Sequence, residues 1–130
     1  MTPFGQKLRD LRTARGVTAK DMAAALRVTP AYLSALEHGR RGRPSWRLVQ
    51  AIIGYFNVIW DEAEEIERLA RLSHPRIVID TSGLDPKATE LANRLAEGIA
   101  HFSPADIERL LEILPAKPRR KPPPAASRPR

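Results

Sequence analysis

The side chains that most often carry out chemistry in proteins are scattered in this sequence rather than grouped. The chain has 130 residues, no cysteine and three histidines, His38, His74 and His101. The absence of cysteine excludes disulfides, thiolate zinc sites and cysteine nucleophiles. The histidines lie far apart and lack the His-x-x-x-His or glutamate spacing of a metal site. We therefore predict no metal site and no cofactor.

A cluster of carboxylates between Asp61 and Glu67 is dense enough to raise the question of acid-base catalysis. The cluster coincides with the start of an expected helix, where carboxylates favour the positive end of the helix dipole. A solvated helical face explains this crowding better than a catalytic pair does, because no nucleophile, base and orienting group occur together. We predict that the protein is not an enzyme.

Lysine and arginine are concentrated at the two ends of the chain. Residues 1–47 hold 10 Lys and Arg against 3 Asp and Glu, whereas residues 48–114 hold 6 against 12. The last 16 residues add 6 basic side chains and no acidic one. A basic N-terminal part is the electrostatic footprint expected of a nucleic-acid binder.

The first 73 residues contain the periodicity and the stop signals of five helices. Apolar residues at helical spacing predict a first helix from Phe4 that stops at Gly16, and a second that follows Thr18 and ends near Arg27. A third helix begins with Thr29 as N-cap and Pro30 at its first position, and stops at Gly39. The last two are expected to start at Ser45 and Asp61. Trp46 and Trp60 flank the fourth helix, and we expect them in the core or in an interface.

The remainder of the chain has a different pattern. The β-branched run at residues 77–79 predicts a short strand or an extended linker. Two further helices are expected to open at Asp85-Pro86 and at Ser103-Pro104, each with one apolar face. Residues 115–130 consist mostly of proline, alanine, lysine and arginine, and we expect them to be a disordered basic tail.

The segment from Thr18 to Gly39 contains two short helices joined by a tight turn. It reads TAKDMAAALRVTPAYLSALEHG and is followed by an arginine-rich loop. Its apolar positions, the small Ala23 and the Glu37-x-Gly39 ending resemble the Xre/Cro/phage-repressor helix-turn-helix family. The resemblance covers residues 4–58 and implies that Arg12 pairs with Glu37 as a structural bridge.

The same resemblance implies that the protein binds double-stranded DNA through the second helix, the third helix and the loop after it. The recognition segment would run from Thr29 to Ala35 in the major groove, with the other positions facing the sugar-phosphate backbone. The implied DNA-binding residues are Ala19, Lys20, Thr29, Pro30, Ala31, Tyr32, Ser34, Ala35, Arg40, Arg41 and Arg43.

Two features of this segment depart from the family pattern. Arg27 stands where the family often has a glycine in a left-handed conformation, which costs a non-glycine residue about 1 kcal/mol. The third helix also lacks the amide side chains that pair with adenine, since Pro30, Ala31 and Ala35 are apolar. We expect these side chains to favour thymine methyl groups, and DNA shape, bridging waters or arginines in the groove to supply the remaining specificity.

The sequence therefore predicts an all-α protein in three parts. Residues 1–73 form a five-helix Xre-like helix-turn-helix head, residues 74–114 a small helical C-terminal module for dimerisation, and residues 115–130 the tail. We expect a cytoplasmic, nucleoid-associated homodimer that regulates transcription as a repressor and has no membrane segment. The alternative is an antitoxin-type protein whose C-terminal helices neutralise a partner protein while its head regulates its own operon.

Overall fold

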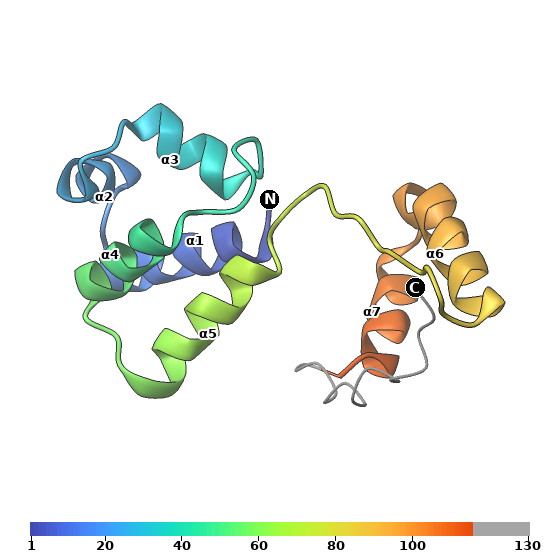
Figure 1. The fold of residues 1–130 in the computed structure, drawn as a ribbon. Coiled ribbons are helices and arrows are strands. Elements are labelled where there is room, and N and C mark those ends of the chain that lie inside the picture. The colour runs from blue at the N-terminus through green and yellow to red at the C-terminus, as the bar shows by residue number, and fades with distance from the viewer. Residues whose placement is uncertain (116–130) are drawn as a thin grey trace. The chain divides into compact units, whose positions relative to one another are not determined.

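The computed structural model describes residues 1–115, and every regular element in that range is a helix. This arrangement confirms the predicted all-α fold. The chain divides into two compact units, Met1–Ile77 and the part that begins at Val78 (Figure 1). Apart from Pro115, the predicted basic tail lies outside the described residues.

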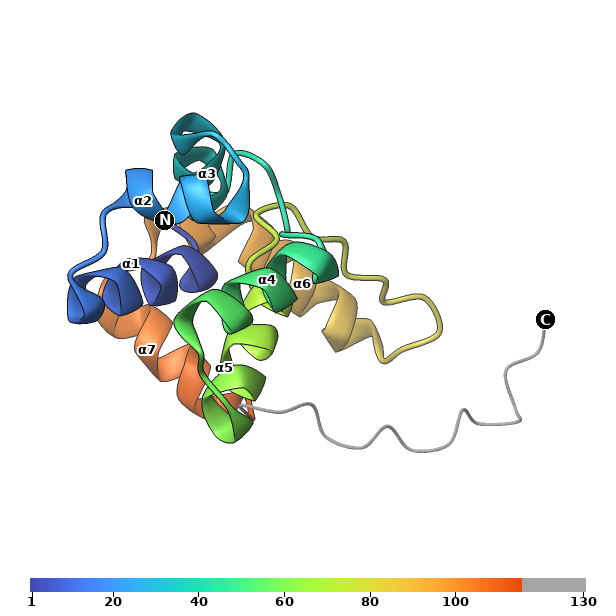
Figure 2. The same ribbon diagram turned by 90° about the vertical axis from the view of Figure 1, so that its left-hand side faces the viewer.

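The first unit, which we call the head, consists of five helices. They are α1 (Pro3–Arg15), α2 (Ala19–Leu26), α3 (Pro30–Glu37), α4 (Trp46–Phe56) and α5 (Trp60–Arg71). Helix α1 packs against α3 and α5, which lie on opposite sides of it in both ribbon views (Figure 1 and Figure 2). Helix α2 packs against α3 and α4. This arrangement holds α2 and α3 together at one edge of the head.

Each of the first four helices begins at a hydroxyl side chain that accepts a hydrogen bond from a backbone N–H of the first turn. Thr2, Thr18 and Thr29 each accept at 3.0 Å, and Ser45 accepts at 3.2 Å. Such a cap satisfies one of the amide groups that the first turn leaves without a helical partner. The helix starts are therefore encoded within a few residues of sequence.

The core of the head is a single cluster of buried apolar side chains drawn from all five helices. Its most buried side chains, each at most 1% exposed, include Phe4 and Leu8 from α1, Leu33 from α3, and Ile52 and Phe56 from α4. The remaining buried members are Leu11, Met22, Ala23, Leu36, Val49, Val58, Ile66 and Ala70. Burial of this cluster supplies most of the free energy that holds the helices in place.

The turn between α4 and α5 differs from its prediction. Helix α5 begins at Trp60, one residue before Asp61, and no side chain caps it. Trp60 is 81% exposed and Trp46 is 74% exposed, so the expectation that they could belong to the core is wrong. Both side chains stand at the first position of a helix and off its core-facing side, which carries Val49, Ile52 and Phe56 in α4 and Ile66 and Ala70 in α5.

The second unit holds α6 (Pro86–Gly98), a short 3₁₀ turn (Ile99–His101) and α7 (Pro104–Ile113). Asp85 caps α6, and Ser103 and Asp106 form a reciprocal capping box on α7. The hydrogen bonds from the Ser103 hydroxyl and backbone, together with Arg109, lower the pKa of Asp106. Residues 77–79, expected as a strand or an extended linker, form no strand.

Neither α6 nor α7 has a fully buried residue. The apolar faces predicted for these helices exist, but Leu91, Leu111 and Leu114 are each more than half exposed. None of the helices within residues 1–115 is long and apolar enough to cross a membrane. The second unit therefore contrasts with the head, which encloses a core of its own.

Candidate nucleic-acid interface

Helices α2 and α3 are joined by a tight turn built on Arg27. This residue caps α2 in a left-handed conformation with φ 60°, and its backbone N–H donates to Ala23 and Ala24 of the preceding turn. The backbone N–H of Val28 also donates to the Ala23 carbonyl, at 3.0 Å. Two helices connected in this way form the helix-turn-helix unit of many DNA-binding domains.

Helix α3 buries one face and exposes the other. Leu33 and Leu36 are each 1% exposed and anchor the helix to the core. On the opposite face, the structure leaves Thr29, Pro30, Ala31 and Ser34 exposed, and Tyr32 and Ala35 half-buried. The N-terminal part of α3 is thus an open surface of small and weakly polar side chains.

The start of α2 adds two positions to this surface. Ala19 is half-buried and packs against the core, whereas Lys20 is exposed. The backbone of this first turn is held by Thr18, whose hydroxyl accepts from the Asp21 N–H at 3.0 Å. The exposed ammonium of Lys20 therefore stands on a fixed helix start.

The loop after α3 carries three exposed arginines, Arg40, Arg41 and Arg43. The loop is anchored to the head at both ends. The backbone N–H of Arg40 donates to the Ala35 carbonyl at 2.8 Å, and Pro44 is buried. The guanidinium carbon of Arg41 lies 5.4 Å from the centroid of the Tyr32 ring, in cation–π geometry. The structure thus brings one loop arginine onto α3 itself.

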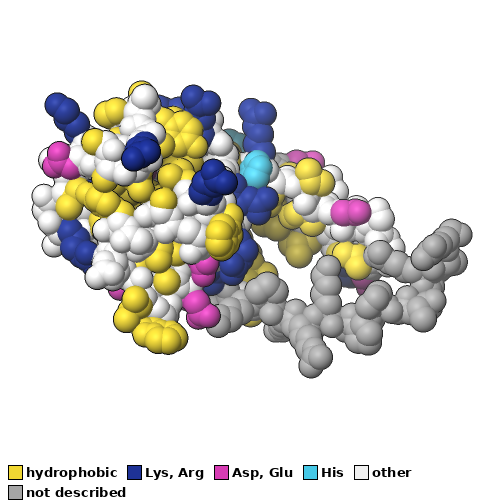
Figure 3. All heavy atoms as spheres, turned by 60° about the vertical axis from the view of Figure 1, so that its left-hand side comes forward, with side chains coloured by type: hydrophobic (Ala, Val, Ile, Leu, Met, Phe, Trp, Pro, Cys, Tyr) yellow, Lys and Arg dark blue, Asp and Glu magenta, His cyan; other side chains and the backbone are white. Residues whose placement is uncertain are grey.

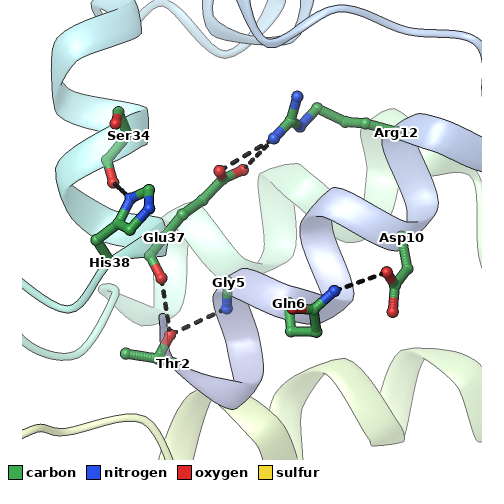
Figure 4. A network of polar contacts seen from close by, with 8 residues as sticks. All are labelled: Thr2, Gly5, Gln6, Asp10, Arg12, Ser34, Glu37 and His38. Atoms are coloured by element: carbon green, nitrogen blue, oxygen red, sulfur yellow. Dashed lines mark hydrogen bonds and ion pairs between the residues drawn. The ribbon is translucent and has the colours of Figure 1, made fainter.

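Arg12 and Glu37 form a buried ion pair between α1 and α3 (Figure 4). The Arg12 Nη2 atom lies 2.8 and 3.0 Å from the two carboxylate oxygens of Glu37. Their side chains are 13% and 4% exposed, so the pair lies inside the head rather than on its surface. The backbone carbonyl of Glu37 also accepts from the Thr2 N–H at 3.0 Å. This network holds the C-terminal end of α3 against α1.

The basic side chains of the head are visible on its surface. Figure 3 shows Lys and Arg side chains spread over the upper part of the head in that view, where Asp and Glu are sparse. Residues 1–47, which include α1 to α3 and the arginine loop, carry a formal charge of +7 when counted from 10 basic and 3 acidic residues. Such a surface attracts polyanions.

Sequence reasoning missed two features of this region. The contact between Arg41 and Tyr32 depends on the path of the loop, and no local sequence pattern predicts it. The close approach of Gly5 to Glu37 was also missed, although a glycine inside the periodic pattern of a helix is a signal for such packing. Within the described residues, no group of three or more histidine or acidic side chains is arranged to hold a metal ion.

Comparison with known proteins identifies the same segment. A helix-turn-helix domain family matches residues 3–74, which is more than half of the chain. An uncharacterised HTH-type transcriptional regulator of Bacillus subtilis, RghRB, is 34% identical over 61 residues, which is 47% of this chain and 44% of the relative. The HTH-type transcriptional regulator DdrOP3 of Deinococcus deserti is 36% identical over 63 residues, or 48% of each chain.

The family match is confined to the head, and the chain spans about half the length of the curated relatives it matches. No solved structure matches significantly. The matched residues contain the tight turn at Arg27, the exposed face of α3 and the buried Arg12–Glu37 pair. The chain belongs to the helix-turn-helix domain family.

Proposed function

We propose that the head binds double-stranded DNA sequence-specifically and that the protein regulates transcription as a dimeric repressor. The observation that carries this proposal is the open N-terminal face of α3, flanked by Lys20 and by the exposed arginines of the following loop. Family membership supports DNA binding, and the names of the two relatives support a role in transcription. The residue pattern from Thr18 to Gly39 supports a head of the Xre/Cro/phage-repressor type. Such a protein works in the cytoplasm, on the nucleoid.

Helix α3 is the recognition helix in this proposal. Its core-facing leucines fix its orientation, and its exposed residues Pro30, Ala31 and Ser34 are small enough for close approach to base edges in the major groove. The apolar members contact thymine methyl groups, because their side chains have no hydrogen-bond donor or acceptor for the base edges in the groove. Lys20, Arg40 and Arg43 bind phosphates and set the register of the head on the duplex.

The second unit holds two copies of the chain together in this proposal. An apolar groove of about 470 Å³ is lined by Leu91, Leu95, Phe102 and Leu110, together with charged residues of both signs. Both helices lack a buried residue, so a second copy that covers their apolar faces gains the burial that one copy cannot provide. A bound dimer represses because it occludes the polymerase.

The salt dependence of DNA binding tests the role of the loop arginines. The variant with both Arg40→Ala and Arg43→Ala should bind a duplex pool more weakly, because each phosphate contact releases counterions. The slope of log affinity against log salt concentration should flatten by about 0.9 for each lost contact. Fluorescence anisotropy between low and moderate salt measures this slope.

Arg71→Ala is the matched control, since Arg71 is exposed but lies on α5, outside the α2–α3 pair. It should keep the slope of the unmodified protein. An unchanged slope in the Arg40 and Arg43 variant would place the loop away from the DNA backbone and contradict the proposed interface.

A further inference from the structure

The loop that follows α3 turns back over the helix it has just left. Gly39 has φ 80°, a left-handed conformation that suits glycine, and the Arg40 N–H donates to the Ala35 carbonyl. The Arg41 guanidinium stands over the ring of Tyr32, a residue of the first turn of α3.

Tyr32 is a rigid platform for this contact. Its backbone N–H is held by the Thr29 hydroxyl at 3.0 Å, and its half-buried side chain packs against the core of the head. A cation over an aromatic face is attracted by the negative face of the ring, which favours one orientation of a long side chain. The stack therefore restricts Arg41 without burying it.

The contact with Tyr32 is an attraction between the charge of Arg41 and the ring face, with the guanidinium carbon 5.4 Å from the ring centroid. The five N–H donors of a guanidinium lie in one plane and form a rigid fork. No carboxylate within the described residues forms an ion pair with Arg41. The pair thus presents a planar, charged fork of donors beside the exposed face of α3.

We propose that Arg41 reads a guanine in the major groove and that Tyr32 is its positioning residue. A guanidinium fork pairs with the O6 and N7 acceptors of guanine, which are exposed in the major groove. The assignment removes Arg41 from the phosphate-binding group in which the sequence places it. It rests on the proposed function, in which α3 is the recognition helix.

The surroundings of Arg41 favour base contact over phosphate contact. Arg40 and Arg43 have no aromatic partner within residues 1–115, and a phosphate requires only a nearby positive charge. The exposed residues of α3 are mostly apolar and cannot form a bidentate pair. Arg41 supplies the donor pair that the helix lacks.

Selection of binding sites from a randomised duplex library with the full-length chain tests the proposal. The unmodified protein should enrich sites with a required guanine in each half-site. Arg41→Lys keeps the charge but loses the planar fork, so it should lose the guanine preference by about 5- to 150-fold. The slope of log affinity against log salt should stay the same in this variant. Arg43→Ala, in the same loop, should flatten the slope and select the same site.

Replacing the selected guanine by 7-deazaguanine deletes one acceptor and preserves base pairing. This change should weaken binding by the unmodified protein and leave Arg41→Lys unaffected. Tyr32→Phe keeps an aromatic face and should retain the guanine preference, whereas Tyr32→Leu should show the pattern of Arg41→Lys. Circular dichroism of each variant confirms that the head is folded.

The possible failures are distinguishable. If Arg41→Lys selects the same guanine as the unmodified protein, or 7-deazaguanine has no effect, Arg41 is a phosphate contact and the inference is wrong. If Tyr32→Phe loses the preference while remaining folded, the aromatic stack is not what positions Arg41. If the unmodified protein enriches no duplex at low salt, the proposed function fails, and this inference fails with it.

Discussion

At the scale of single residues, the Arg12–Glu37 pair places two opposite charges inside the head. Both side chains are largely removed from water, and the Arg12 Nε atom is buried without a hydrogen-bond partner. The charge of Arg12 is therefore compensated mainly by the two carboxylate oxygens of Glu37. A buried ion pair adds modest net stability, but the loss of one partner leaves the other charge unpaired in the interior.

Glu37→Gln should lower the free energy of unfolding by about 3 kcal/mol, because the amide cannot neutralise the guanidinium. Urea denaturation followed by circular dichroism measures the change as a lower midpoint with an unchanged dependence on urea concentration. Asp10→Asn is the control, since Asp10 is exposed and bonds only to Gln6 of the same helix in Figure 4. A difference of less than about 0.5 kcal/mol between the two variants would contradict the compensating role of Glu37.

At the scale of elements, the contact between α1 and α3 depends on the missing side chain of Gly5. A Cβ atom at this position would lie 2.1 Å from the carbonyl oxygen of Glu37 and 2.7 Å from its carbonyl carbon. These are backbone atoms, which cannot move aside as a side chain can. The same carbonyl accepts the Thr2 N–H, so separating the helices also strains the start of α1.

Gly5→Ala should destabilise the head by about 3 kcal/mol, at the upper end of the usual cost of overpacking. Thermal unfolding measures this as a lower melting temperature. Gly54→Ala is the matched control, because a Cβ there meets no atom within 4 Å. Gly54 lies inside α4, where alanine is favoured over glycine by roughly 0.5–1 kcal/mol. Equal effects of the two substitutions would refute the close approach as the reason for Gly5.

At the scale of the whole molecule, the two units differ in how completely they bury apolar surface. The head has its own apolar core, and the buried hydroxyl of Ser73 accepts from the Phe4 N–H at 2.9 Å. The second unit exposes Leu91, Leu111 and Leu114. The division of labour that we propose, with DNA binding in one unit and dimerisation in the other, follows from this contrast.

Truncation after Ile77 should convert a dimer into a folded monomer, because it removes α6 and α7 and leaves the core of the head complete. Light scattering at micromolar concentration measures the mass. In the full-length chain, Leu111→Arg should also give a monomer, since a charge on the apolar face opposes its burial. A truncated head that remains dimeric would remove the second unit from this role.

The sequence by itself determined where most of the helices begin, with α5, which has no side-chain cap, as the exception. Caps such as Thr18, Thr29 and Ser45 form hydrogen bonds within three residues, and Gly16 adopts the left-handed conformation that ends α1. Such interactions are local, so the residue types that form them can be recognised from the sequence without knowledge of the fold. The apolar periodicity likewise predicted the buried face of α3, because a core-facing stripe must repeat with the helical turn.

Apart from the Arg12–Glu37 pair, which the family resemblance implied, the tertiary structure decided which residues of different elements meet. Trp46 and Trp60 are large apolar residues, yet they lie off the core-facing sides of α4 and α5 and are exposed. The stack of Arg41 on Tyr32 and the approach of Gly5 to Glu37 depend on how the loop returns and how α1 crosses α3. These contacts join different elements of the head, and their geometry is set by packing rather than by any local pattern.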